Sequence, residues 1–435
     1  MNNVALGMNS YALAGRVRPQ AHPLVLRIRF QLPMALLLGV GLPLFVRGGF
    51  APNIYVNEGT INSIAVCTLA VIAAYFGWRR LHQFPGVQLA ASALWSVGLA
   101  FGAAIALLLL LRLDYNRTLL VAAPVMTALW LVVIAFVMTR AAGVRIGVVP
   151  GGAVGSLPRS RRVEWVPLVE PGRAPGVDAY VADLRYDHSP AWEEFIADRT
   201  LDGVPVYHSK QVLEHLTGQV SIEHLSENNF GSVLPNLNYV AAKRLIDLAL
   251  VAVLLPLLVP VFAALWLAIR LVDGPEPLFR QKRKGMGGRC FTVYKFRTMR
   301  DVPEAGIDPF EAARTKDNDK RVTPLGNVLR KTRLDEIPQV INIVLGEMTW
   351  IGPRPEASVL GERYESAFPF YRYRYAVRPG ITGWAQVNQG HVVDDADIRV
   401  KLRYDFYYVK NISPWLDLLI AIKTIRIVLW GVGAR

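Results

Sequence analysis

Cysteine and charge are both scarce in this chain of 435 residues. Its two cysteines, Cys67 and Cys290, stand far apart, which excludes a disulfide framework and a cysteine-based metal cluster. The seven histidines show no metal-ligand spacing either. Because 19% of the residues are charged and 52% are hydrophobic, the composition excludes a disordered or coiled-coil protein and is more apolar than that of a purely soluble one.

The charge that is present is mostly basic. The 48 lysines and arginines outnumber 34 acidic residues, and the net charge of +14 favours anionic partners such as phosphates, nucleic acid or anionic lipid. The arginines are dispersed and belong to no nucleic-acid recognition motif, so we expect no nucleic-acid partner. Net charge alone does not decide between phosphates and lipid.

Four apolar runs follow one another in the first third of the chain, near residues 31–46, 60–77, 87–111 and 118–138. Each approaches or exceeds the roughly 20 residues that cross a bilayer core of about 30 Å, so the sequence predicts four transmembrane helices. The basic stretch before the first run is too long for a removable signal peptide, and no small-residue cleavage site follows that run.

Basic residues gather at the ends of these runs that share one side of the membrane. They are Arg16, Arg18, Arg27 and Arg29 before the first run, Arg79 and Arg80 after the second, and Arg140 and Arg145 after the fourth. An excess of Lys and Arg marks the cytoplasmic side, so these ends are expected in the cytoplasm. Four crossings return the chain to that side.

A fifth apolar run, Leu248–Ile269, is long enough to span a membrane but is interrupted by Pro256 and Pro260. Proline inside a helix removes a hydrogen bond and kinks the axis. Both flanks of the run are basic, beginning with Lys243 and Arg244 on the first side. Equal positive charge favours a re-entrant hairpin with both ends at the cytoplasmic face, and a proline-kinked fifth span stays the alternative.

Residues 144–235 change character, because glycines and prolines divide them into short apolar stretches such as Val144–Val149 and Val177–Val181. This pattern predicts a small α/β domain. The stretch Gly147–Gly155 follows a predicted strand but lacks the G-x-G-x-x-G spacing of a dinucleotide-binding loop. We interpret it as a loop of a structural or regulatory domain.

Residues 273–435 are basic and aromatic, and the chemistry is expected here. Alternation over Phe291–Met299 predicts a strand that presents Lys295 and Arg297 on one face. A polybasic patch that binds anionic lipid headgroups is a second interpretation, compatible with the first. The last segment, Trp415–Trp430, predicts a helix at the membrane interface or, alternatively, a core-packing helix.

The segment Val328–Leu345 is the most informative part of the chain. Thr332 and Asp335 before an apolar run form a capping box, which predicts a helix start with Pro338 in the first turn. The adjacent carboxylates there are Asp335 and Glu336, and the basic neighbours are Arg330, Lys331 and Arg333. A carboxylate that attacks or binds metal, with guanidiniums that hold oxygens, suits phosphoryl-group transfer. The metal would be Mg²⁺ on carboxylate and phosphate oxygens.

Two further arginines stand on turns stiffened by proline and glycine. Arg354 lies in Gly352–Pro355, and Arg378 begins Arg378–Gly383. Such turns fix a guanidinium in space at little ordering cost, although each by itself is an ordinary surface turn.

An ordered series of motifs between residues 239 and 435 closely resembles the bacterial polyprenyl-phosphate phosphoglycosyl transferases. The motifs are Lys243-Arg244 with Asp247, the proline-broken hydrophobic run, Tyr294–Met299, Leu329–Gln339, Gly346–Met348, Gly352–Pro355 and Arg378–Gly383. The layout of the whole chain is similar to that of the large members, which begin O-antigen, capsule or exopolysaccharide assembly.

The resemblance implies a membrane protein with three parts. They are an α-helical transmembrane bundle over residues 1–143, a small, degenerate Rossmann-like α/β domain over 144–238, and a mixed α/β catalytic domain over 239–435. The catalytic domain is expected to contain a re-entrant membrane helix over 243–272, broken at Pro260 and at the additional Pro256, and an interfacial C-terminal helix. Because UDP-sugars are cytoplasmic, the resemblance places it on the cytoplasmic face of the bacterial inner membrane, in contact with membrane lipids. A homodimer is a further expectation from the family.

The resemblance also implies a two-step reaction. Asp335 attacks the β-phosphate of a UDP-hexose, with UDP-galactose and UDP-glucose as the leading candidates, releases UMP and carries the sugar phosphate covalently. Undecaprenyl phosphate then takes the sugar phosphate. Glu336 matches the partner that, with Asp335, holds Mg²⁺. Positional match makes Arg330, Lys295, Arg297, Arg354 and Arg378 candidates for phosphate and nucleotide contacts.

A non-catalytic membrane scaffold is the alternative hypothesis. Its basic patch would dock anionic lipid or an acidic partner, so its binding would be lost at high salt and no UDP-sugar would yield UMP. The Asp335–Glu336 pair, inside a basic segment beside a broken membrane helix, favours the transferase.

Overall fold

The computed structural model describes residues 27–49, 57–140, 143–160, 163–222, 235–300, 321–389 and 394–430. The chain divides into two compact units, Met1–Gly218 and Gln219–Arg435. Arg16 and Arg18, which entered the orientation argument, lie outside the described residues. The domain limits expected near residues 143 and 238 stay predictions.

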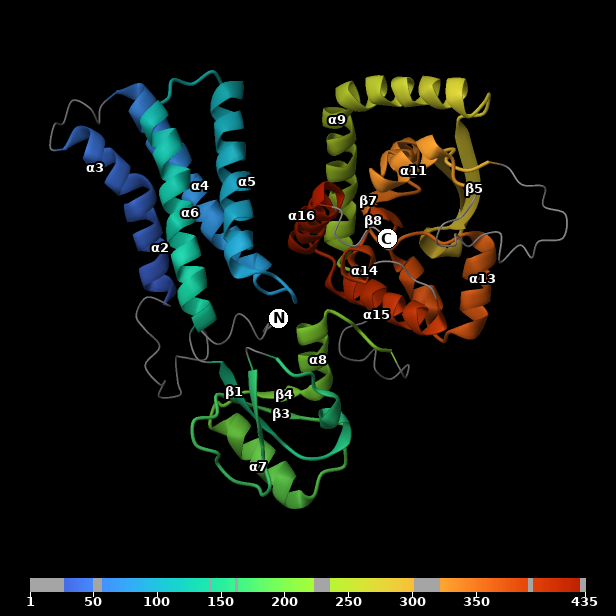
Figure 1. The fold of residues 1–435 in the computed structure, drawn as a ribbon. Helices are drawn as coiled ribbons and strands as arrows, with labels where there is room; N and C mark the ends of the chain where they lie inside the picture. The colour runs from blue at the N-terminus through green and yellow to red at the C-terminus, as the bar shows by residue number, and fades with distance from the viewer. Residues whose placement is uncertain are drawn as a thin grey trace. The chain divides into compact units, whose positions relative to one another are not determined.

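The first unit begins with long apolar helices, drawn in blue to teal in Figure 1. The first of these among the described residues has three parts, α2 (Ile28–Leu36), the π-helical turn η3 (Leu37–Gly41) and α3 (Leu42–Gly48). The next three are α4 (Glu58–Leu81), α5 (Leu89–Leu110) and α6 (Arg117–Arg140). All four are long and apolar enough to cross a membrane, which agrees with the runs predicted from the sequence.

These helices bury aromatic residues against one another and leave large aliphatic residues outside. Tyr75 and Trp78 of α4 are almost fully buried in the shared core, whereas Leu69 on the same helix and Val121 on α6 are exposed. The buried Gln31 side chain accepts a hydrogen bond from the Tyr75 hydroxyl at 2.9 Å, which satisfies a polar group that lipid could not. The pattern is that of a membrane protein.

A four-stranded parallel sheet with the order β2-β1-β3-β4 completes the first unit. Its strands are β1 (Val144–Val148), β2 (Val163–Pro167), β3 (Ala179–Ala182) and β4 (Val206–His208). The helices of this region are α7 (Pro190–Leu201) and α8 (Ser209–Thr217). Val212 of α8 packs against Ile146 on one face, and Phe195 of α7 packs against Tyr180 on the other. The small α/β region that the sequence predicted is confirmed.

A carboxylate at the end of β3, that of Asp183, binds the loop after β1. Gly151 has a φ of +119°, which glycine adopts readily, and the chain then turns through the 3-10 segment Gly152–Ser156. Asp183, at the end of β3, accepts a hydrogen bond from the Ala153 amide at 2.8 Å. A phosphate at this loop would have to displace that like-charged group, so the arrangement favours a structural or regulatory loop.

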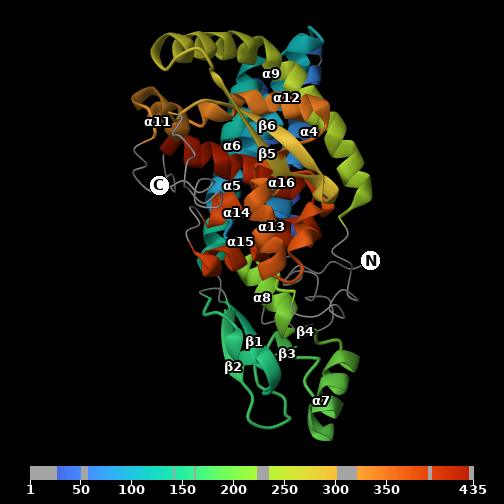
Figure 2. The ribbon, with the colours of Figure 1, turned by 90° about the vertical axis from the view of Figure 1, so that its right-hand side faces the viewer.

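The second unit surrounds two small sheets with helices (Figures 1 and 2). The antiparallel hairpin consists of β5 (Leu278–Lys284) and β6 (Cys290–Phe296), and the parallel pair consists of β7 (Thr349–Ile351) and β8 (Gly380–Thr382). The helices are α9 (Leu237–Val272), α11 (Pro324–Lys331), η8 (Leu334–Gln339), α12 (Val340–Leu345), α13 (Ser358–Ala367), η9 (Tyr371–Ala376), α14 (Trp384–Asn388), α15 (Asp395–Asn411) and α16 (Pro414–Trp430). The last segment is therefore helical, and its place at a membrane interface stays a prediction.

Helix α9 is sharply bent, with one upright and one horizontal arm in Figure 1. Pro256 and Pro260 lie inside it, and only 6% of its most apolar stretch is buried. Val251 in the first half packs with Ile343 of α12, and Ile269 near the end packs with Phe296 of β6. A straight helix of 36 residues would be about 54 Å long, so the bend is what returns its end to the same unit.

Candidate active site

Three segments of the second unit bring charged side chains together. Strand β6 supplies Lys295, the 3-10 helix η8 supplies Asp335 and Glu336, and the loop after β7 supplies Arg354. The chain enters η8 by a reversal at Arg333, whose φ of +59° is left-handed. Because a 3-10 helix has about three residues per turn, Asp335 and Glu336 leave it in different directions.

The capping box predicted at Thr332 is wrong. Thr332 is the residue that ends α11, and its hydroxyl donates backward to the Val328 carbonyl at 2.9 Å rather than forward to a following amide. The left-handed Arg333 then separates α11 from η8. Asp335 and Glu336 nevertheless lie in the first turn of the next helical segment, as the sequence predicted.

Glu336 is the centre of an ion cluster. It is 5% exposed, and its Oε1 lies 2.6 Å from a terminal nitrogen of Arg354, 3.2 Å from Lys295 Nζ and 3.6 Å from a terminal nitrogen of Arg333. Burial alone would raise the pKa of this carboxyl, but Arg354 and Lys295 hold the pKa far below its usual range. Glu336 is therefore ionised at any physiological pH.

Asp335 is buried to a similar extent, but its pKa is shifted in the opposite direction. It is 7% exposed, and its Oδ1 is buried without a hydrogen-bond partner. Burial and the neighbouring Glu336 raise the pKa of Asp335. A carboxylate with an unsatisfied oxygen beside a cluster of cations is a candidate nucleophile or metal ligand, because its lone pairs are not already used.

Lys295 is also perturbed. Burial lowers the pKa of its ammonium group to about 8, with Arg354 and Arg283 contributing in the same direction and Glu336 opposing them. Its charge therefore begins to be lost at mildly alkaline pH, where an ordinary lysine is still fully protonated.

Arg354 stands on a loop whose backbone is in close contact with the strand-forming motif that follows Arg378. A Cβ on Gly380 would lie 2.1 Å from the Gly352 nitrogen, and a Cβ on Gly352 would lie 2.5 Å from the Arg378 carbonyl oxygen. Only glycine allows this approach of two backbones. The guanidinium of Arg354 donates to the Ile381 carbonyl at 3.4 Å as well as to Glu336.

The other arginines predicted from the sequence lie elsewhere in the unit. Arg297 follows β6 and donates to the Asp273 carbonyl at 2.7 Å, and Arg378 donates through Nε to the Gly346 carbonyl at 2.9 Å. Arg330 is half-buried in the last turn of α11, five residues before Asp335. The structure thus brings Lys295 and Arg354 to the carboxylates and ties Arg297 and Arg378 to backbone carbonyls. The prolines predicted to break α9 lie inside that helix.

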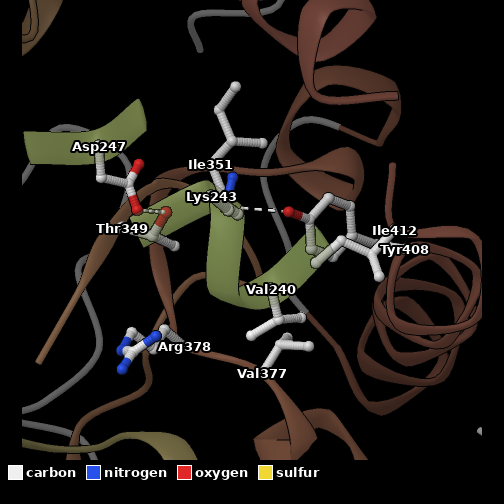
Figure 3. Close-up of a pocket in the computed structure, with 9 residues that line it drawn as sticks. All are labelled: Val240, Lys243, Asp247, Thr349, Ile351, Val377, Arg378, Tyr408 and Ile412. Carbon is white, nitrogen blue, oxygen red and sulfur yellow. Dashed lines mark hydrogen bonds between the residues drawn. The ribbon is translucent and has the colours of Figure 1, made fainter. Parts of the chain in front are cut away.

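A small pocket lies where the first arm of α9 meets β7, and Arg378 lines it together with Lys243, Asp247, Thr349 and Tyr408 (Figure 3). Asp247 accepts a hydrogen bond from the Thr349 hydroxyl at 2.7 Å, and Lys243 forms an ion pair with Asp417 of α16. The motif residues at the start of α9 therefore hold this helix to the unit.

Sequence reasoning missed Arg283 and Arg374. Both contact the backbone of the Arg354 loop, although they lie far from it in the sequence. Arg283 was visible only as one of several basic residues in β5, and Arg374 as one of several in an aromatic segment, so no spacing signal distinguished either residue.

The carboxylate pair fits a hard divalent cation. Among the described residues no group of three or more His, Cys, Asp or Glu side chains is placed to hold a metal. Asp335, with its unpartnered Oδ1, stands next to Glu336, so the pair provides two carboxylates. Mg²⁺ commonly binds one or two carboxylates and completes its shell with substrate phosphates and water.

The apolar helices indicate a membrane protein, and a buried carboxylate pair among cations suits phosphoryl-group transfer. The sequence pattern of bacterial sugar transferases matches residues 238–431. The chain is 39% identical over 415 residues to the UDP-N-acetylgalactosamine-undecaprenyl-phosphate N-acetylgalactosaminephosphotransferase of Aeromonas hydrophila, covering 94% of this chain and 97% of that protein. The chain belongs to the bacterial sugar transferase family.

Two further relatives are similar over a shorter part of the chain. The UDP-glucose:undecaprenyl-phosphate glucose-1-phosphate transferase of Xanthomonas campestris pv. campestris is 38% identical over 188 residues, covering 43% of this chain and 38% of that protein. The protein of the same name from Escherichia coli (strain K12) is 37% identical over 185 residues, covering 42% of this chain and 39% of that protein.

The two carboxylates are expected to respond differently to neutralisation. Glu336→Gln should destabilise the protein by about 3 kcal/mol, because it leaves Lys295 and Arg354 without their buried counter-charge. Asp335→Asn removes an unsatisfied buried charge and should leave stability unchanged or raise it by roughly 1 kcal/mol or less. Thermal unfolding of both variants in the same detergent measures the difference. Equal losses of stability would contradict this description of the pair.

Proposed function

We propose that this protein transfers a hexose 1-phosphate from a UDP-hexose to undecaprenyl phosphate through a covalent intermediate on Asp335. The observation that carries the proposal is the unpartnered, buried Oδ1 of Asp335 beside a cation cluster that Glu336 holds together. Membership of the bacterial sugar transferase family and the names of the three relatives support the substrate classes.

The first step forms a bond from an Asp335 carboxylate oxygen to the β-phosphorus of the UDP-hexose and breaks the bond from that phosphorus to the oxygen bridging to UMP. The leaving UMP takes the electron pair. In the second step a phosphate oxygen of undecaprenyl phosphate attacks the same phosphorus, and Asp335 leaves as a carboxylate. The products are undecaprenyl-diphosphate-hexose and the free enzyme.

The cations near the pair have distinct tasks in this reaction. Lys295 and Arg354 lie beside the carboxylates, where they stabilise the negative charge that develops on the transferred phosphoryl group. Arg330, in the last turn of α11, is the candidate for the nucleotide phosphate. For Arg297 and Arg378, the hydrogen bonds to backbone carbonyls favour a structural role over phosphate binding.

Asp335 and Glu336 are the residues that would hold Mg²⁺. A bound Mg²⁺ would neutralise charge on the diphosphate of the donor. The chain's own contribution is to keep Glu336 ionised through Arg354 and Lys295 and to keep one oxygen of Asp335 without a hydrogen bond.

Three UDP-sugars are candidates for the donor. UDP-galactose and UDP-glucose are the candidates from the resemblance, the two shorter alignments involve relatives named for UDP-glucose, and the full-length alignment involves one named for UDP-N-acetylgalactosamine. The product would serve as the first lipid-linked sugar of O-antigen, capsule or exopolysaccharide assembly. A homodimer stays a prediction from the family.

We also propose that α9 is a re-entrant helix and that the second unit lies on the cytoplasmic face of the inner membrane. Both halves of α9 pack against the same unit, at Val251 and at Ile269, which supports entry and exit on one side. The outward side chains of its bend, such as Val253 and Leu257, are apolar and exposed, as lipid contact requires.

The covalent step predicts that Asp335→Asn abolishes UMP release from every UDP-sugar in a panel of UDP-galactose, UDP-glucose and UDP-N-acetylgalactosamine. The amide has no anionic oxygen to attack phosphorus. Asp395 is an exposed carboxylate at the start of α15. The variant Asp395→Asn is the matched control and should keep wild-type rates. Mass spectrometry of enzyme quenched with the donor should place the sugar phosphate on Asp335. An adduct on another residue, or UMP release by Asp335→Asn, would remove this mechanism.

The perturbed pKa values predict a bell-shaped dependence of kcat/KM on pH. Asp335 must be ionised to attack, and its raised pKa places the acidic limb above about 4, the ordinary value for Asp. Lys295 loses its charge as pH rises through its pKa of about 8, so activity should fall there. Lys295→Arg keeps the charge and should move the alkaline limb upward. An alkaline limb that stays in place in Lys295→Arg would assign it to another group.

The re-entrant arrangement predicts one-sided access to both ends of α9. In a background without Cys67 and Cys290, Asn238→Cys and Glu276→Cys should react with an impermeant maleimide in inverted membrane vesicles and not in intact spheroplasts. Asp114→Cys, between α5 and α6, should show the reverse pattern and is the control. Labelling of Asn238→Cys and Glu276→Cys from opposite sides would establish a fifth span instead.

A further inference from the structure

The loop that carries Arg354 is held by two arginines from distant segments. Arg374, in η9, donates through a terminal nitrogen to the Arg354 carbonyl at 2.7 Å. Arg283, in β5, donates to the carbonyl of the next residue, Pro355. Two successive carbonyls of one loop are thus bound by two guanidiniums, neither of which the catalytic proposal uses.

Arg374 is buried with its own set of counter-charges. It is 4% exposed, lies 2.9 Å from Asp405 and 4.0 Å from Glu356, and also donates to the Tyr371 hydroxyl. Glu356 in turn forms an ion pair with Lys401. Burying a group of charges is costly, and well-packed apolar residues would often hold a fold as well. A geometric requirement on the loop would offset this cost.

That requirement is the position of the Arg354 guanidinium. The backbone carbonyl of Arg354 accepts a hydrogen bond from Arg374. One terminal nitrogen of the Arg354 side chain donates to the Ile381 carbonyl at 3.4 Å, and the other donates to Glu336 at 2.6 Å. The Arg354 guanidinium is planar and rigid, and it is bound to both the Ile381 carbonyl and Glu336. A shift of the loop would therefore move the nitrogen that contacts Glu336. Outer contacts of this kind set the orientation of the groups that touch the substrate.

We propose that Arg374 and Arg283 are positioning residues, which hold the backbone of residues 354 and 355 so that the Arg354 guanidinium meets Glu336 in the arrangement needed for transfer. This inference rests on the proposed function, since it concerns the cluster around Asp335. A general support of the fold is the competing explanation, and the two differ in how the variants combine.

A double-mutant cycle on kcat for UMP release separates them. Arg374→Lys keeps the charge but loses the planar fork, so kcat should fall roughly ten- to a hundredfold with KM for the UDP-sugar changed less than about threefold. The kcat of Arg354→Lys should fall at least as far. If Arg374 acts through Arg354, the double variant should be no slower than Arg354→Lys alone, because the position of a missing fork no longer matters.

Arg372→Lys is the matched control, since Arg372 lies two residues away in η9 and its side chain is 75% exposed. It should keep wild-type kcat and should leave the rate of Arg354→Lys unchanged. Single-turnover measurements with enzyme in excess extend the range to very slow variants. Thermal unfolding in detergent is recorded for every variant, so that a loss of folded protein is not counted as a loss of kcat.

Losses that multiply in the double variant would overturn the inference and assign Arg374 to fold support. If Arg374→Lys is not recovered as folded protein, Arg283→Lys replaces it, with the same two outcomes at the neighbouring carbonyl. Failure of the proposed function itself is distinguishable, because the wild-type enzyme would then release no UMP from any UDP-sugar with undecaprenyl phosphate present.

Discussion

The ion cluster around Glu336 is the interaction on which the catalytic unit depends. One carboxylate oxygen gathers Lys295 from β6, Arg354 from the loop after β7 and Arg333 from the turn before η8. Lys295 and Arg354 are 41 and 18 residues away from Glu336 in the sequence, so the cluster fixes the relative positions of β6, η8 and the loop after β7. Cations offset the cost of burying Glu336, and the buried Lys295 and Arg354 would lose their counter-charge without it.

The membrane imposes the second constraint. A helix with two prolines and an apolar surface needs an anchor at its base, and the start of α9 supplies one through Asp247 bound to Thr349 and Lys243 paired with Asp417. Arg244 donates to the Ile343 and Val344 carbonyls at the end of α12, the helix that continues from η8. The carboxylate pair is therefore linked through α12 to α9, which suits the proposed transfer to a lipid phosphate.

Sequence patterns predicted those features that depend on local properties. Long apolar runs predicted α4, α5 and α6 to within a few residues, and the adjacent carboxylates lie in the first turn of a helical segment, as the sequence predicted. Thr332 was misinterpreted because a threonine hydroxyl can bond backward to a helix carbonyl as easily as forward to an amide. The tasks of Arg297, Arg378, Arg283 and Arg374 depend on which backbone carbonyl lies beside them in three dimensions, and no periodicity in the sequence encodes that.

Two carboxylates that are neighbours in sequence point in different directions, because successive side chains of a 3-10 helix such as η8 lie about 120° apart. Glu336 faces the cations and loses its proton affinity, whereas Asp335 faces a place where one oxygen finds no donor. A nucleophile bound by three cations would have its lone pairs occupied, and a carboxylate without cations could not join three segments. In the proposed mechanism these tasks are divided between two adjacent residues, because the cations on Glu336 would also face the phosphate carried by Asp335.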